Sequence, residues 1–305
     1  DVRILYSQGC DLYKDKVENL AWDQDRISEA VITAENSDVV ILCVGLNETL
    51  EGEEGDTGNS DASGDKVDLH LPKVQEELIE KVTAVGKPTI VVLMAGSAID
   101  LNYAQDNCNG ILLAWYPGAR GGRAIADLLF GKESPSGKLP ITFYKDLEGM
   151  PEFTDYSMKN RTYRYMEKEA LYPFGYGLTY SDTCVTEAEV VGEVSAESDI
   201  MLKATVKNNG TVDTDEVVQV YIKDLDSPLA VRNYSLCGFK RVSLKAGEEK
   251  SVEFTISNKA MNIVDEDGNR YIAGKHFRLF AGVSQPDTRS AELTGHKPAE
   301  VEIAL

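Results

Sequence analysis

The chain has 305 residues, of which 42% are hydrophobic and 8% aromatic, so it is long enough for two domains with separate cores and too apolar to be disordered. Its formal charge of -20 and its pI near 4.6 argue against nucleic acid and anionic membranes as partners, because both require a basic protein face. No apolar run reaches the roughly 18 residues that a membrane span needs. We therefore expect a soluble protein with no nucleic-acid partner and no membrane partner.

The cysteines and the start of the chain bear on its location. The five cysteines form an odd, widely spaced set without a CxxC pair, which predicts neither a disulfide framework nor a zinc site and favours a reducing compartment. No basic and then apolar segment resembles a signal peptide, so the expected location is cytoplasmic. Because "DVRILY" opens as a strand without an initiator methionine, we interpret the chain as a fragment or a processed protein.

From residue 1 to about residue 143, short apolar runs alternate with helical periodicity. Strands are predicted at 1–6, 38–44, 87–96, 110–116 and 138–143. The run at 38–44 is continuously hydrophobic, which is typical of a strand buried on both faces. Helices are predicted at 25–36, where Asp23 could cap the N-terminus, after Pro72, and at 121–131. This alternation predicts an α/β fold with a doubly wound, mostly parallel sheet and helices on both faces.

From about residue 182 the pattern changes to period two. Half-buried strands are predicted at 200–210, 215–224, 237–257 and 275–282, separated by Asn-Gly, Ala-Gly and Asp-Gly turns. This pattern is typical of an all-β sandwich of the immunoglobulin or fibronectin type III sort. The expected domains are therefore 1–143 and 182–305.

The segment 144–181 between these domains is too aromatic to be a flexible linker, so it must pack against something. We expect its rings to form an exposed docking face, because a free surface normally tolerates few apolar rings. The rings in question belong to Tyr163, Tyr165, Tyr172, Phe174 and Tyr176.

An acidic stretch follows the strand at 38–44. Between Gly45 and Pro72 there are eight acids and a single lysine, Lys66, over a loop of about 27 residues, much longer than the usual connection of about 4–6. Such crowding of like charge is unfavourable unless the carboxylates contact something, and ligands of open α/β sheets bind beyond the carboxyl ends of the strands. A solvated excursion remains an alternative, whereas a calcium loop is disfavoured because the EF-hand spacing is missing.

A carboxyl group in this stretch could act as a general acid if a partly dry pocket and neighbouring anions raised its pKa. Glycoside hydrolysis needs such a group together with a second carboxylate.

Other candidates for functional residues are weaker. Ser97 lacks the G-x-S-x-G elbow, and His70, His276 and His296 are too few and too scattered for a triad or metal site. Trp115 and Tyr116 could stack on a sugar, although packing under the adjacent glycine-rich turn explains them more simply.

A series of motifs in order then suggests a family. They are "VGLNETLEGEEGD", "LPKVQEELIEKV", "PTIVVLMAGSAIDL", "ILLAWYPGARGGRAIADLLFGKESPSGKLPITF", "YRYMEKEALYPFGYGLTYS", "VKNNGTVDTDEVVQVYIKD" and "LCGFKRVSLKAGEEKSVEFTI". Together they cover nearly the whole chain, which resembles the C-terminal half of the glycoside hydrolase family 3 β-glycosidases. The resemblance implies an α/β-sandwich domain followed by a fibronectin type III-like domain. It also implies a preceding TIM-like barrel, outside this chain, that carries the nucleophile and most of the sugar-binding residues.

The resemblance also implies a site. Relatives place a glutamate three residues before an aspartate after the strand that ends in Val-Gly, and here that pattern is Glu51, Glu53 and Asp56. It assigns the general acid/base role to Glu53, with Asp56 as its local partner and with Glu51 and Glu54 as alternative assignments. No metal and no organic cofactor are implied.

The function implied is the acid/base half of a retaining, exo-acting β-glycosidase that hydrolyses β-glucosides or β-xylosides. Its partners would be the substrate and the barrel, and this chain alone would be inactive. The alternative is a non-catalytic carbohydrate-binding or scaffolding module that keeps the same fold.

Overall fold

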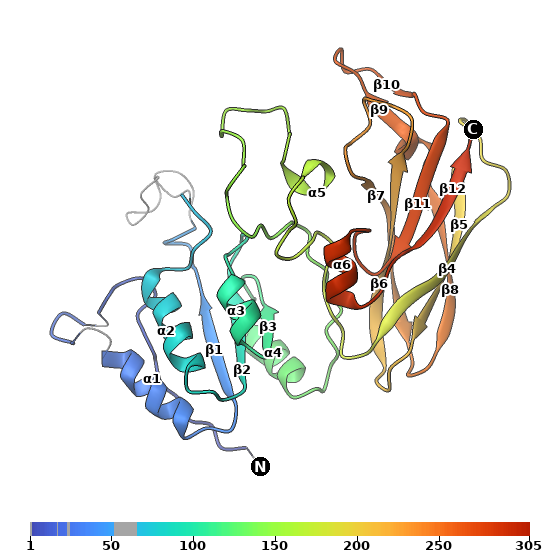
Figure 1. Cartoon of the computed structure of the whole chain (residues 1–305). Coiled ribbons are helices and arrows are strands. Elements are labelled where there is room, and N and C mark those ends of the chain that lie inside the picture. The colour runs from blue at the N-terminus through green and yellow to red at the C-terminus, as the bar shows by residue number, and fades with distance from the viewer. Residues whose placement is uncertain (1, 17, 23–24, 52–65) are drawn as a thin grey trace. The chain divides into compact units, whose positions relative to one another are not determined.

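The structure is a computed structural model that describes residues 2–16, 18–22, 25–51 and 66–305 (Figure 1). The chain divides into two compact units. Unit 1 comprises Asp1–Ala126 and Tyr144–Leu147, and unit 2 comprises Asp127–Phe143 and Glu148–Leu305. Within the described ranges, no helix is both long enough and apolar enough to cross a membrane.

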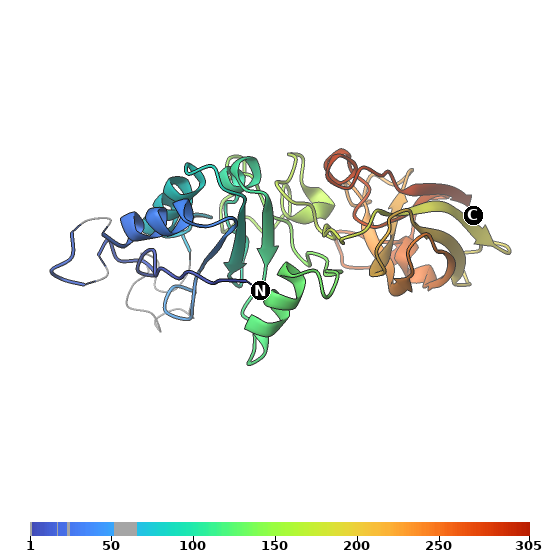
Figure 2. The ribbon, with the colours of Figure 1, turned by 90° about the horizontal axis from the view of Figure 1, so that it is seen from below.

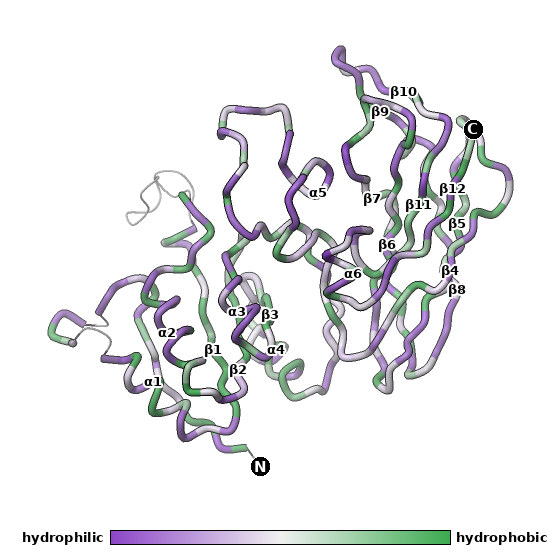
Figure 3. The backbone as a smooth tube through the Cα atoms, in the orientation of Figure 1, coloured by the Kyte–Doolittle hydropathy of each residue, from purple (hydrophilic) through white to green (hydrophobic). Residues whose placement is uncertain are grey.

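A parallel sheet forms the centre of unit 1. Its strands β1 (Val40–Gly45), β2 (Thr89–Met94) and β3 (Gly110–Leu113) lie in the order β1-β2-β3. Figure 3 shows these strands among the hydrophobic parts of the chain. The strands predicted at 38–44, 87–96 and 110–116 are thus confirmed, and so is their parallel arrangement.

Helices lie on both sides of this sheet. Figure 2 shows α1 (Asp25–Glu35), α2 (Lys73–Thr83) and α3 (Asn102–Asn107) on one side of the strands and α4 (Gly121–Leu129) on the other. Helix α2 follows Pro72 and buries the predicted apolar positions, which are Val74, Leu78, Ile79 and Val82. The predicted cap Asp23 lies outside the described residues. The doubly wound α/β fold is therefore confirmed.

Three local predictions for unit 1 and the residues after it are wrong. Strand β1 pairs only with β2 among the described residues, and Ile41 on its outer face is 45% exposed, so β1 is an edge strand and is not buried on both faces. Residues 2–6 form no strand, because they find no sheet partner in the described part of the chain. Residues 138–143 also form no strand, and only Phe143 makes a β-bridge, to Tyr172.

Unit 2 is an antiparallel β-sandwich, as predicted. One sheet has the order β12-β11-β6-β7 and the other the order β4-β5-β8. Side chains from the two sheets fill the core between them; Val218, Leu202 and Phe277 are among the most buried. The bounds are β4 (Thr183–Val191), β5 (Ile200–Asn208), β6 (Thr214–Asp224), β7 (Ser235–Leu244), β8 (Glu249–Ile256), β11 (His276–Gly282) and β12 (Ala299–Ala304).

Short elements complete unit 2. The 3-10 helix η1 (Asn258–Met261) leads into a hairpin of β9 (Asn262–Val264) and β10 (Arg270–Ile272), and two short helices, α5 (Thr162–Tyr165) and α6 (Thr288–Thr294), lie outside the sheets. Two predicted turns have the expected backbone: Gly247 between β7 and β8 and Gly268 between β9 and β10 both adopt positive φ.

The rings of the aromatic segment pack inside unit 2. The Tyr163 ring stacks on Phe174 with ring centroids 4.3 Å apart, and it meets the edge of the buried Tyr221 ring at 6.1 Å. Tyr172 is buried and stacks on Tyr176. The expectation that this segment packs against something is confirmed. Among the rings expected to form an exposed docking face, Tyr172 is buried and Tyr163, Phe174 and Tyr176 are half-buried against other rings, so the docking face stays a prediction.

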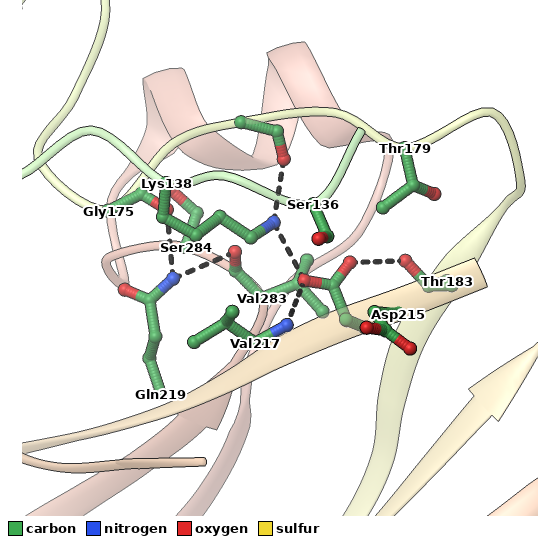
Figure 4. Close-up of polar contacts among 12 residues, drawn as sticks. Ser136, Lys138, Gly175, Thr179, Thr183, Asp215, Val217, Gln219, Val283 and Ser284 are labelled. Carbon is green, nitrogen blue, oxygen red and sulfur yellow. Dashed lines mark hydrogen bonds and ion pairs between the residues drawn. The ribbon is translucent and has the colours of Figure 1, made fainter. Parts of the chain in front are cut away.

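A buried polar network ties residues 127–143 and the end of the aromatic segment to the sandwich (Figure 4). The Lys138 ammonium lies 2.8 Å from the Glu216 carboxylate, with side-chain exposures of 8% and 2%, and donates to the Gly177 carbonyl. Thr183 and the Val217 amide donate to the same carboxylate. These contacts explain why residues 127–143, which we expected in the first domain, group with unit 2.

Candidate functional site

The site lies where the parallel strands of unit 1 end at their carboxyl edge. The buried Gln75 side chain of α2 fixes the end of β1: its oxygen accepts from the Gly45 amide at 2.7 Å, and its nitrogen donates to the Gly45 carbonyl at 2.7 Å. The same nitrogen donates to the Leu12 carbonyl at 2.6 Å. The chain therefore leaves the sheet from a fixed point.

A tight turn follows at residues 47–51. The Asn47 side chain accepts from the Thr49 amide and hydroxyl, and the Asn47 carbonyl accepts from the Leu50 and Glu51 amides. Local side-chain bonds of this kind are the reason that asparagine favours turns. The turn places the Glu51 carboxylate against the segments that follow β2 and β3.

The Glu51 carboxylate accepts hydrogen bonds from three donors. The Gly96 amide donates to it at 2.8 Å, and the hydroxyls of Ser97 and Tyr116 donate as well. Gly96 is needed for this fit, because a Cβ there would lie 2.9 Å from the Tyr116 ring and 3.3 Å from the carboxylate. Trp115 adopts a positive φ of 51°, uncommon for a non-glycine residue, directly before Tyr116.

Lys66 approaches the same point from the other end of the acidic stretch. Its ammonium donates to the Ser97 hydroxyl at 3.0 Å and to the Ala98 carbonyl at 3.0 Å. The Ser97 hydroxyl therefore accepts from Lys66 and donates to Glu51. Residues 52–65 lie in sequence between two side chains that meet at one serine.

The surroundings decide the charge of Glu51. Partial burial alone would raise its pKa, but the hydrogen bonds from Ser97, Tyr116 and Gly96, together with the Lys66 charge, outweigh burial and lower the pKa. Burial lowers the pKa of Lys66, and the charges of Glu51 and Asp68 only partly offset that effect. Burial and the contact with Glu51 raise the pKa of the Tyr116 phenol. Near neutral pH the Glu51 side chain is therefore an ionised carboxylate, which has no proton to donate.

The structure locates only one of the residues singled out for catalysis. Glu53, Glu54 and Asp56 lie outside the described residues. Glu51 is described, and it contacts Ser97 and Tyr116. The sequence offers Ser97 as a weak candidate nucleophile and Tyr116 as a candidate sugar platform, and in the structure both donate to Glu51. Lys66 was visible in the sequence as the single cation among eight acids, which was the signal that could have identified it as a partner of one of them.

The three histidines are not brought together. Each pairs with a different carboxylate: His70 with Glu76, His276 with Asp226, and His296 with Asp182. The described residues contain no group of three or more histidine, cysteine or acidic side chains placed to hold a metal ion. Each histidine therefore makes its own local contact with a carboxylate.

The described geometry is a doubly wound α/β unit, with Glu51 and Lys66 held at the carboxyl edge of its sheet, followed by a β-sandwich. The family model described as "Glycosyl hydrolase family 3 C-terminal domain" matches residues 6–180, and the one described as "Fibronectin type III-like domain" matches residues 216–285. The chain belongs to glycosyl hydrolase family 3 and corresponds to its C-terminal part.

Individual relatives agree with this assignment. The chain is 39% identical over 270 residues to a xylan 1,4-beta-xylosidase of Xylanibacter ruminicola, with 87% of this chain and 31% of that protein covered. It is 34% identical to a beta-xylosidase of Formosa agariphila, with 96% and 39% covered. A solved β-glucosidase from Erythrobacter marinus superposes with a TM-score of 0.81 at 31% identity, over 99% of this chain and 41% of that one. The chain thus spans about a third to two-fifths of the length of these relatives.

Proposed function

We propose that the chain is the acid/base-bearing part of a retaining, exo-acting β-glycosidase that hydrolyses β-glucosides or β-xylosides. The nucleophile and most sugar contacts would come from a TIM-like barrel outside residues 1–305. The xylosidase and glucosidase names of the relatives support these two substrate classes. We also propose a cytoplasmic location. All five cysteines are free thiols, which is typical of a reducing compartment.

The observation that carries the proposal is the anchored base of the acidic loop. Glu51 and Lys66, which flank residues 52–65 in the sequence, are held at the carboxyl edge of the sheet, which is where ligands of such folds bind. Glu53 follows Glu51 by two residues, so covalent geometry keeps their Cα atoms within about 7 Å. A carboxylic acid tethered this closely to a fixed point can be presented to a substrate held by another domain.

The roles of the acids follow from the two-step mechanism. In the first step Glu53 would donate a proton to the leaving oxygen while the barrel nucleophile attacks the anomeric carbon. In the second step Glu53 would act as the base for the incoming water. The bonds that Glu51 accepts favour an anchoring role for it over the alternative role of proton donor, because they stabilise its ionised form.

The experiment compares leaving groups in the barrel-containing protein. A poor alkoxide leaving group needs a proton, whereas an acidic phenol leaves without one. Glu53→Ala should therefore lower kcat/KM for a β-linked disaccharide by about 10²–10⁴-fold and affect an activated aryl glycoside far less in its first step. Glu48→Ala, at an exposed acid of the same stretch three positions before Glu51, is the matched control and should alter both substrates little. Equal losses for both substrates in Glu53→Ala would contradict the proposal.

A further inference from the structure

We propose that Glu51, Ser97 and Lys66 form a clamp that fixes the base of the acidic loop and makes these three side chains positioning residues for the general acid. This inference rests on the function proposed above, because it concerns the same loop. The clamp itself consists only of described residues and can be tested without any activity.

The first argument is the arrangement of the Ser97 hydroxyl between two charges. A serine hydroxyl has one donor and two acceptor sites, so it can donate to the Glu51 carboxylate and accept from the Lys66 ammonium simultaneously. Hydrogen bonds with one ionised partner are stronger than neutral ones. The Ser97 side chain therefore links Glu51 to Lys66, which flank residues 52–65 in the sequence.

The second argument is that the clamp is attached to the strands of the sheet. The Gly96 amide, after β2, and the Tyr116 hydroxyl, after β3, both donate to Glu51. Lys66 donates to the Ala98 carbonyl as well as to Ser97. Groups held by the ends of regular strands keep their positions better than groups held only by a loop.

The third argument is charge. Lys66 is the only lysine or arginine between Gly45 and Pro72, among eight acids, and its charge acts on Glu51. It partly offsets the repulsion that otherwise would drive the two ends of the loop apart. The clamp thus explains how Glu51 and Lys66, on either side of so acidic a stretch of sequence, are held at the edge of the sheet.

The clamp is tested first in the 305-residue chain. Ser97→Ala should speed hydrogen exchange at the Gly96 amide by about tenfold, as expected for the weakening of a charge-assisted bond. Ser37→Ala is the matched control: Ser37 bonds to the Thr33 carbonyl, so its loss should leave Gly96 unchanged. Circular dichroism should show that both variants fold. Unchanged exchange at Gly96 in a folded Ser97→Ala chain would overturn the clamp whatever the reaction is.

Positioning is tested next in the barrel-containing protein. Ser97→Ala and Lys66→Met should lower kcat for a β-linked disaccharide by about tenfold or more with little change in KM, because misplacing a reacting group by about 1 Å can cost up to 100-fold. Lys66→Arg should restore part of the loss, since it keeps the charge. Glu53→Ala supplies the reference for complete loss of the proton donor.

The outcomes separate the two proposals. Faster Gly96 exchange with unchanged kcat in Ser97→Ala, while Glu53→Ala is impaired, would overturn the positioning role. Faster exchange together with a fully active Glu53→Ala protein would overturn the proposed function and leave the clamp supported. Faster exchange, a lower kcat and partial recovery in Lys66→Arg would support both.

Discussion

At the scale of single residues, the Glu51 carboxylate is surrounded by the Gly96 amide, two hydroxyls and the Lys66 ammonium. All of these interactions favour its ionised form, and their sum exceeds the opposing effect of partial burial. Because the pKa is lowered on folding, Glu51 contributes stability that is fully present above the pKa of the unfolded chain. That contribution is lost as the pH falls through the lowered value.

The lowered pKa of Glu51 gives a prediction for the pH dependence of the site. The chemical shift of the Gly96 amide should change with a midpoint below the ordinary glutamate pKa of about 4.3, because protonation of Glu51 weakens the bond that Gly96 donates. An NMR titration of the chain measures this midpoint. Glu51→Gln, which cannot titrate, should remove the step, and a midpoint at or above the ordinary value would contradict the arrangement.

Composition and charge alone could not tell the acids of the loop apart, and only the family resemblance assigned Glu53. Glu51, Glu53 and Glu54 lie within four positions, and composition gives each the same chance of being the proton donor. What distinguishes Glu51 is contact with residues more than 40 positions away, Gly96, Ser97 and Tyr116. Only the parallel order of β1, β2 and β3 brings the ends of these strands together. The sequence could indicate the region of the site, but it could not indicate which carboxylate is fixed.

At the scale of secondary-structure elements, periodicity predicted the helices and strands that bury one face. Helix α2 and strands β5 and β8 repeat or alternate their apolar residues clearly, and each forms where expected. The segments at 1–6 and 138–143 have the composition of strands, but residues 2–6 and 138–143, which the structure describes, form none. A strand needs a neighbouring strand to pair with as much as it needs suitable residues of its own. The local sequence does not show whether such a neighbour is present.

The segment 138–143 is held by polar contacts instead, and these give a second prediction. Lys138→Met should lower the free energy of unfolding of unit 2 by about 3–5 kcal/mol, because it leaves the buried Glu216 charge without its partner. Combining Lys138→Met with Glu216→Leu should recover part of the loss. Arg278→Met, at exposed pairs with Glu300 and Glu302, is the control and should change stability far less, because water screens exposed ion pairs.

Denaturant unfolding monitored on the chain measures these differences. A loss for Lys138→Met no larger than that for Arg278→Met would show that the pair does not hold this segment to the sandwich. The same result would remove the physical reason for grouping residues 127–143 with unit 2.

At the scale of the whole molecule, the proposed chemistry divides between this chain and a barrel. We expect residues 1–305 alone to hydrolyse neither aryl β-glucosides nor aryl β-xylosides, because a retaining mechanism needs two carboxyl groups about 5–5.5 Å apart. A steady-state assay of the purified chain tests this expectation. Addition of the separately produced barrel should restore turnover only if the two pieces associate, and robust turnover by the chain alone would contradict the division.

The central claim is that Glu53 is the general acid/base, and chemical rescue tests it most directly. In the barrel-containing protein, Glu53→Ala should accumulate the glycosyl-enzyme with an activated aryl glycoside, because the water of the second step has lost its base. Azide needs no base, so it should speed turnover and yield the β-glycosyl azide. Glu51→Ala and Glu54→Ala should show no such rescue. Rescue of either of these variants in place of Glu53→Ala, or of none of the three, would contradict the assignment.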